Sequence, residues 1–84
     1  MALFRVRVFV TLKPSVFDPQ GRTIVESLHS MGYAGVTDVR QGKYFEVQVE
    51  AGDVAAAETL VREVSTKLLA NPVIESFRLE APVA

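Results

Sequence analysis

Residues 3–12 read LFRVRVFVTL, and their strict alternation points to the fold class. Phe4, Val6, Val8, Val10 and Leu12 share one face. Leu3, Arg5, Arg7, Phe9 and Thr11 share the other. A period of two in a stretch rich in Val and Phe predicts a strand with one buried face. The second face is partly apolar, because it carries Leu3 and Phe9.

A helix is predicted after this strand. Asp18 is a good N-cap, and Pro19 fits the first helical position, where a missing N–H costs nothing. Gly32 is a plausible stop, because glycine tolerates a left-handed backbone. The apolar residues between these ends lie on one stripe of the helix: Ile24, Val25, Leu28 and Met31.

Residues 36–50 read as a hairpin. Val36 and Val39 suggest a short, irregular strand, and Gln41-Gly42 suggests a turn in which Gly42 supplies a positive φ. A second strand follows, in which Phe45, Val47 and Val49 alternate with Tyr44, Glu46, Gln48 and Glu50.

A second helix and a last strand complete the chain. Asp53 caps the helix and Asn71-Pro72 ends it. Its predicted apolar stripe consists of Ala57, Leu60, Val61, Val64 and Leu68. Phe77 and Leu79 then share one face of a strand, and residues 81–84 read as a frayed tail.

The order strand, helix, strand, strand, helix, strand predicts an α+β fold over residues 1–84 as a single domain. It is the ferredoxin-like βαββαβ pattern, in which an antiparallel sheet carries two helices on one face. The open face would then expose Leu3, Phe9 and Tyr44. A domain this small has a thin margin of stability, so we expect the open face to be used for oligomerisation, as a dimer or tetramer.

Composition excludes several classes of function. The net charge of −1 is unlike the basic stripe of a nucleic-acid binder, and the absence of cysteine excludes disulfides and thiolate metal sites. Charges interrupt the apolar N-terminal run, so we expect neither a signal peptide nor a membrane span. We therefore expect the protein to be cytoplasmic.

We expect no catalytic, cofactor-binding or metal-ligating residue in this chain. His29 is the only histidine and reads as a helix-edge residue without partners. No serine lies in a G-x-S-x-G elbow, and no Gly-rich phosphate cradle is present.

Two stretches are candidates for contact with a partner. In the first, Gly21 lies at the third helical position, either to pack tightly against a neighbour or to expose N–H groups near Lys13 and Arg22. Asp18 argues against anion binding, because its own carboxylate occupies that end of the helix. In the second, Arg40 and Lys43 flank the predicted turn, as a solvated turn or as a contact surface.

Nearly the whole chain resembles the PurS subunits of bacterial phosphoribosylformylglycinamidine synthase. The resemblance rests on VFVTLKPSVFDPQGRTIVESLHSMGY, on VTDVRQGKYFEVQVE and on the ending NPVIESFRLE. The most specific part spans Lys13 and DPQG, and VRQGK supports it.

This resemblance implies a small, non-catalytic subunit that bridges a large ATP-using synthetase and a glutaminase. The complex converts formylglycinamide ribonucleotide, ATP and glutamine to formylglycinamidine ribonucleotide in de novo purine synthesis. It uses ATP, Mg and glutamine, whereas this chain would bind no cofactor. The candidate partner contacts are Lys13, Asp18, Pro19, Gln20, Gly21, Arg22, Arg40, Gly42 and Lys43.

Two other functions share this order of elements. A free-standing ACT-like regulatory domain would bind an amino acid at a dimer interface. An acylphosphatase-like enzyme would need an arginine in the loop after the first strand and an asparagine to orient water. That loop holds Lys13 and Asp18, and the only asparagine, Asn71, lies near the end of the second helix.

Overall fold

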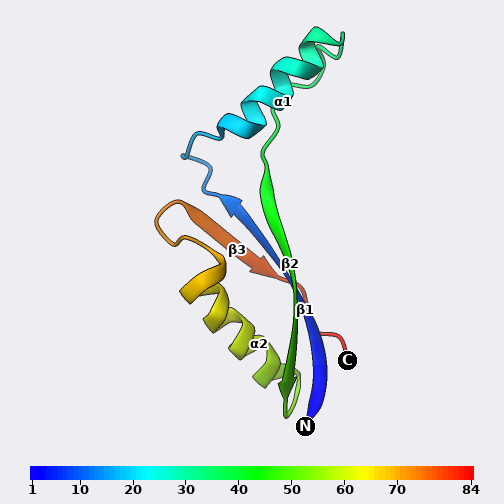
Figure 1. The fold of residues 1–84 in the computed structure, drawn as a ribbon, viewed down its shortest axis with the longest axis vertical. Coiled ribbons are helices and arrows are strands. Elements are labelled where there is room, and N and C mark those ends of the chain that lie inside the picture. The colour runs from blue at the N-terminus through cyan, green and yellow to red at the C-terminus, as the bar shows by residue number, and fades with distance from the viewer.

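A computed structural model describes all residues, 1–84. The elements follow the order β1 (Ala2–Leu12), α1 (Pro19–Ser30), β2 (Gly42–Ala51), α2 (Val54–Val64), a π-helical turn η1 (Ser65–Leu69) and β3 (Glu75–Leu79). The molecule is elongated, with extents of 52 × 26 × 13 Å. Sheet and α2 form its body, and α1 projects beyond one end of the sheet (Figure 1).

The sheet is antiparallel, with the order β2-β1-β3. Strand β1 pairs with β2 from Ala2↔Ala51 to Thr11↔Gly42, and with β3 from Val8↔Leu79 to Leu12↔Glu75. The long first strand is therefore central, and both of its neighbours are edge strands. This agrees with the predicted α+β class.

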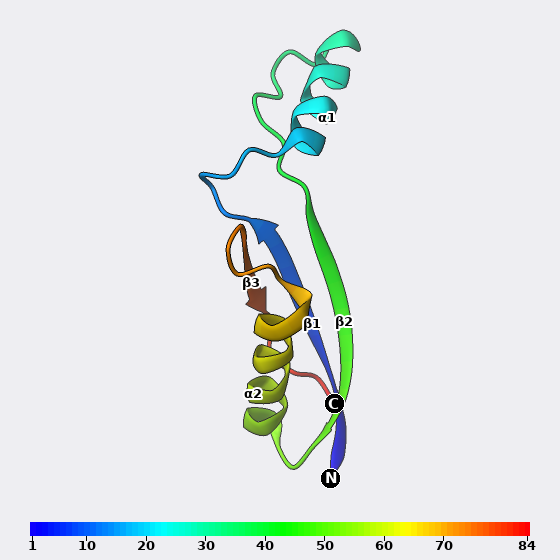
Figure 2. The same cartoon turned by 60° about the vertical axis from the view of Figure 1, so that its left-hand side comes forward.

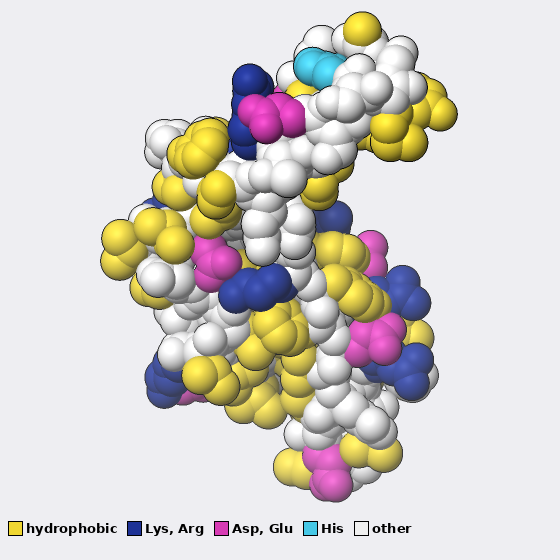
Figure 3. Space-filling model, turned by 45° about the horizontal axis from the view of Figure 1, so that its top comes forward, with side chains coloured by type: hydrophobic (Ala, Val, Ile, Leu, Met, Phe, Trp, Pro, Cys, Tyr) yellow, Lys and Arg dark blue, Asp and Glu magenta, His cyan; other side chains and the backbone are white.

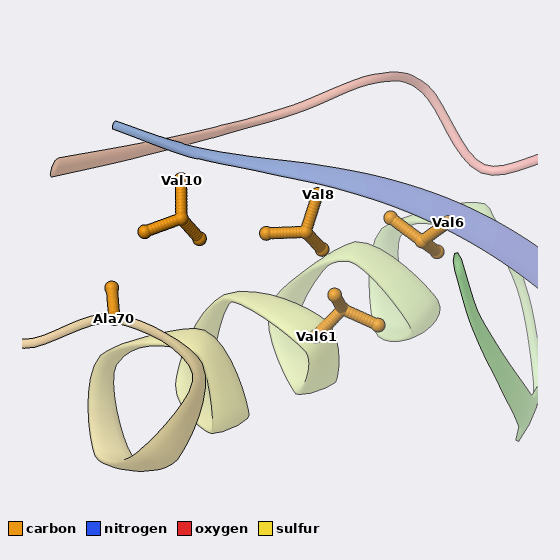
Figure 4. Packing of buried hydrophobic residues seen from close by; sticks show 5 residues of the cluster. All are labelled: Val6, Val8, Val10, Val61 and Ala70. Carbon is orange, nitrogen blue, oxygen red and sulfur yellow. The ribbon is translucent and has the colours of Figure 1, made fainter. Parts of the chain in front are cut away.

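The core lies between one face of the sheet and α2. Val6, Val8 and Val10 of β1 are fully buried against Val61 of α2 and the nearby Ala70 (Figure 4). The alternation read from residues 3–12 therefore predicted the buried face correctly. Burying these valines removes apolar surface from water, which is the main source of stability in a domain of this size.

Two predictions for residues 36–42 differ from the structure. No strand forms at Val36–Val39, so the sheet has three strands, and Gly42 is not in a turn but is the first residue of β2. The only residue with a positive φ is Gly32, at 96°. Gly42 is needed for another reason: a Cβ there would overlap the carbonyl oxygen of Val10 on the neighbouring strand.

Helix α1 ends as predicted but packs differently. Gly32 donates to the carbonyl of His29 (3.0 Å) and Tyr33 to that of Leu28 (2.9 Å), which is the Schellman ending. The predicted layer of two helices on one face is, however, formed by α2 alone. The segments that flank α1 are long enough to carry it past the end of the sheet (Figure 2).

The predicted apolar stripe of the second helix is interrupted at its end. Residues 65–69 form a π turn, in which Ala70 N–H donates to the carbonyl of Ser65 (2.9 Å). One extra residue per turn changes the helical phase, so Leu68 is 82% exposed while Ala70 is buried. Leu60 is also partly exposed, at 41%.

The C-terminal residues are held to the sheet instead of fraying. Arg5 and Val83 exchange backbone hydrogen bonds of 2.7 and 2.9 Å, and Glu80 N–H donates to the carbonyl of Arg7 (3.0 Å). Residues 80–83 thus continue the line of β3 along β1.

Candidate partner-contact site

Two stretches of the chain segments that join α1 to the sheet, residues 13–18 and 39–41, lie side by side and are called the neck here (Figure 1). Arg40 spans them, because its Nη2 donates to the carbonyls of Lys13 (3.0 Å) and Val16 (2.8 Å). The sequence alone suggested a solvated turn or a partner contact for Arg40. The structure assigns it a bracing role within the chain.

Asp18 is the second brace of the neck and is only 4% exposed. Its Oδ1 accepts from the N–H of Gly21 (2.9 Å), which caps α1, and its Oδ2 accepts from the N–H of Gln41 (2.7 Å). These two N–H groups, Gln41 first, lower the pKa of the Asp18 carboxyl below its ordinary value. Burial opposes this shift, and the charge of Arg40 adds to it.

Gly21 packs against the second segment of the neck. A Cβ at this position would overlap the carbonyl oxygen of Val39. The structure therefore supports the packing interpretation of Gly21. The anion-site interpretation has no support, because the Asp18 carboxylate occupies the start of the helix.

Lys13 ties the neck to the loop before β3. Its backbone N–H donates to the carbonyl of Ile74 (2.8 Å), and its Nζ donates to the carbonyl of Pro72 (2.9 Å). Together with Arg40, these bonds make the loops at this end of the sheet one connected unit.

The remaining predicted contact residues lie outside this network. Pro19 and Gln20 are exposed in the first turn of α1, and Arg22 is exposed beside Glu26, with 3.1 Å between Nε and Oε1. Gly42 is part of β2. Lys43 pairs with Glu75 across the end of the sheet at 3.4 Å. The N–H of Asn71 lowers the pKa of Glu75, and Lys43 contributes to the same shift.

Sequence reasoning missed several residues of this region. Gln41 contributes a backbone N–H, which no side-chain pattern reveals. Phe17 is 69% exposed next to the buried Asp18, and Val73 is 77% exposed in the loop that Lys13 holds. A phenylalanine within a loop of Pro, Ser and Asp could have been noticed, because such a position rarely needs an aromatic side chain for packing.

The apolar residues on the open face of the sheet are less exposed to solvent than expected. Phe9 is half-buried, because the guanidinium of Arg78 lies 4.2 Å from its ring centre and the Tyr44 ring lies 5.1 Å away. Tyr44 donates to Glu46 Oε2 (2.8 Å), which raises the pKa of its phenol. Leu3 is 52% exposed, so the face still offers some apolar surface.

His29 is held by a backbone group. Its Nε2 lies 2.7 Å from the carbonyl oxygen of Val36 and donates to it. No three side chains of His, Cys, Asp or Glu gather in a group that could hold a metal ion. None of the helices is long and apolar enough to cross a membrane.

Comparison with known proteins places the chain among small subunits of one enzyme. Residues 5–82 match the family described as PurS, phosphoribosylformylglycinamidine (FGAM) synthase. The PurS subunit of this synthase from Bacillus subtilis is 50% identical over 78 residues, covering 93% of this chain and 92% of that protein. The one from Synechocystis is 44% identical and covers 92% and 77%.

Solved structures agree with these sequence relatives. The C2 crystal form of B. subtilis PurS superposes with a TM-score of 0.82 at 51% identity, covering 92% of this chain and 95% of that one. A chain in the structure of PurLQS from Thermotoga maritima superposes with a TM-score of 0.89 at 32% identity, covering 96% and 99%.

Proposed function

The chain belongs to the PurS family, the small subunits of phosphoribosylformylglycinamidine synthase, and we propose that it bridges the synthetase and glutaminase subunits of that complex. It is a subunit of this enzyme of purine biosynthesis, and its complex contains PurL- and PurQ-type partners, as the PurLQS structure does. The proposal concerns its role within that assembly, which is to hold the two catalytic subunits in register for ammonia transfer.

The neck carries this proposal. Four hydrogen bonds, from Arg40 to Lys13 and Val16 and from Gly21 and Gln41 to Asp18, fix the loop that exposes Phe17 and the first turn of α1. A loop that is already ordered loses little conformational entropy when a partner binds it. A rigid apolar residue beside exposed polar groups is therefore suited to contact a catalytic subunit.

Bridging helps the reaction without chemistry in this chain. Ammonia released by one subunit must reach the other before it escapes to water or is protonated. Holding the two active sites together raises the effective concentration of ammonia at the second site. In this proposal the ATP, Mg and glutamine of the reaction bind to the catalytic subunits, and no cofactor binds here.

We also propose that the chain is a homo-oligomer within the complex. The body of the molecule is small, with 12 of 84 residues buried. On α1 and in the turn that follows it, Ile24 is 39%, Met31 68% and Tyr33 56% exposed. Figure 3 shows apolar side chains at the surface of this end of the molecule, near the histidine. Apolar surface of this kind is typical of a chain that packs against another subunit.

We also propose that the chain is cytoplasmic. A chain without cysteine gains nothing from an oxidising compartment. Purine synthesis also needs ATP and glutamine, so we place the complex in the cytoplasm.

Reconstitution tests the bridging role. The chain is mixed with the synthetase and glutaminase subunits, and product formation is measured with glutamine and then with free ammonia. We expect glutamine-dependent turnover to need this chain, while turnover with ammonia does not. A chain that joins no complex and changes neither rate would contradict the proposal.

Variants test the contact surface in the same assay. Phe17→Ala, Gln20→Ala and Arg22→Ala should weaken assembly and lower glutamine-dependent turnover while the fold stays intact. Arg62→Ala is the matched control, because Arg62 forms an i,i+4 pair with Glu58 on α2 (2.9 Å) much as Arg22 does with Glu26 on α1. Equal behaviour of all four variants would show that Phe17 and the first turn of α1 are not the contact.

A further inference from the structure

A hollow opens on the open face of the sheet, where the chain after β3 runs beside β1 toward the C-terminus (Figure 1). The pairing of β3 with β1 ends at Leu79↔Val8, and a further pair, Val83↔Arg5, lies in the chain after it. Between these two pairs the C-terminal segment has one residue more than the stretch of β1 that it faces, which is the arrangement of a β-bulge. A bulge bends its strand, and the hollow beside this one has a volume of about 440 Å³.

Arg5, which lines this hollow, is the only basic residue of the chain whose side chain has no partner. Several of the others pair with carboxylates: Arg7, Arg22, Lys43, Arg62 and Lys67. Lys13 and Arg40 donate to backbone carbonyl oxygens, and the guanidinium of Arg78 lies over the ring of Phe9. The Arg5 guanidinium is therefore free to bind another molecule.

The register of the sheet explains why Arg5 lacks a partner. Arg7 lies opposite Glu46 of β2 on one side and beside Glu80 on the other, and its Nη1 lies 3.6 Å from Oε1 of Glu80. Arg5 lies on the same face of β1, between Gln48 of β2 and the valine of the isolated pair after β3. Directly opposed residues share a face of the sheet, so carboxylates flank Arg7 and neutral side chains flank Arg5.

We propose that this hollow binds a small organic carboxylate, with the carboxylate oxygens on the Arg5 guanidinium and the carbon body against Leu3 and Val83. A guanidinium carries a permanent positive charge, and its planar fork of N–H groups matches the two oxygens of a carboxylate. Leu3 is 52% and Val83 64% exposed, and both line the hollow. Its volume is within the range of small-molecule sites. This site goes beyond the bridging role and does not depend on it.

The charges around the hollow favour a singly charged anion. Two positive side chains, Arg5 and Arg7, and one negative side chain, Glu80, give its lining a net charge of +1. A single carboxylate balances this charge, whereas a phosphate dianion brings a second negative charge close to the carboxylate of Glu80. The amide of Gln48 also lines the hollow, and its NH2 can donate to a carboxylate oxygen.

Butyrate is a suitable probe, because it joins one carboxylate to a short apolar chain. Saturation-transfer difference NMR with the full chain measures its binding. We expect a dissociation constant in the millimolar range, as is usual for so small a ligand. Butylamine, which has the same apolar chain and a positive charge, should not bind. Inorganic phosphate should not displace butyrate.

Two variants remove the free charge in different ways. Arg5→Gln deletes the guanidinium, and we expect the dissociation constant of butyrate to rise about tenfold or more. Gln48→Glu keeps Arg5 but places a carboxylate directly opposite it, so it should weaken butyrate binding to a similar extent without lowering the melting temperature. Arg62→Gln, which changes an exposed arginine on α2, is the control and should leave butyrate binding unchanged.

Several outcomes would overturn the site. Wild-type affinity for butyrate in folded Arg5→Gln or in Gln48→Glu would show that the Arg5 guanidinium does not bind it. Displacement of butyrate by phosphate would overturn the preference for a carboxylate. Loss of the butyrate signal in the reconstituted complex would overturn a small ligand, because a catalytic subunit would then cover the hollow. Glutamine-dependent turnover of that complex tests bridging separately, so the two proposals can fail independently.

Discussion

Asp18 shows most clearly how one residue positions the candidate site. Its carboxylate accepts one N–H from α1 and one from the segment that leads into β2, so a single side chain sets the start of the helix and closes the neck. Asp53, the cap of α2, accepts only from Ala56 (2.8 Å). The two caps look alike in sequence, and only Asp18 has the second partner.

Asp18→Asn should therefore cost more than Asp53→Asn. An asparagine is nearly as good a cap as aspartate, but its amide has one oxygen, so its NH2 must face one of the two N–H donors. We expect the melting temperature to fall by about 5 °C or more for Asp18→Asn and to change little for Asp53→Asn. Equal effects of the two variants in thermal denaturation would argue against the second bond.

The same carboxylate gives stability a pH dependence of defined sign. Because the folded-state pKa of Asp18 is lowered, its contribution is present above the unfolded-state pKa and is lost as the pH falls through the folded-state value. The melting temperature of the wild-type chain should drop on acidification, and that of Asp18→Asn should drop less. Parallel acid limbs in melting curves between about pH 2 and 7 would show that other carboxyls dominate.

Gly21→Ala separates helix propensity from packing. Alanine favours a helix over glycine, yet a Cβ here would overlap the carbonyl of Val39, so we expect a loss of about 1–3 kcal/mol in the free energy of unfolding. Gly52, which has open space around it, is the control, and Gly52→Ala should stay within about 0.5 kcal/mol. Urea denaturation measures both, and a stabilised Gly21→Ala would contradict the contact.

At the scale of elements, the end of the second helix determines which leucines are buried. The π turn over Ser65–Leu69 rotates the chain so that the continuation of the α-helical stripe faces solvent. Ser65, fully buried, donates its hydroxyl to the carbonyl of Val61 (2.7 Å), which satisfies a polar group in the core.

Val61 and Leu68, both predicted to be core residues, should behave differently. Val61→Ala removes fully buried methyl groups and should cost about 2–3 kcal/mol, whereas Leu68→Ala, at an 82% exposed position, should change the free energy of unfolding by less than about 0.5 kcal/mol. Urea denaturation of the two variants checks this. A large loss for Leu68→Ala alone would indicate that the oligomer buries it.

For the whole molecule, oligomerisation links stability to concentration. If the folded state is a dimer and the unfolded state is not, a tenfold increase in protein concentration should raise the melting temperature by about 4 °C. Calorimetry over two decades of concentration measures the slope. A melting temperature independent of concentration would mean that the free chain unfolds as a monomer.

The sequence by itself determined the α+β class, the buried face of β1, both helix caps and the glycine that ends α1, because each depends on periodicity or on groups within a few residues. Its resemblance to PurS subunits was confirmed by comparison, while the predicted contact residues stay a prediction. Tertiary structure decided the rest. The missing strand at Val36–Val39, the true role of Gly42 and the projecting α1 depend on backbone groups far apart in the chain. Gly21 meets Val39, Gln41 bonds Asp18, and Arg40 bonds Lys13 and Val16 only after the two segments have been brought together, and no local pattern records such contacts.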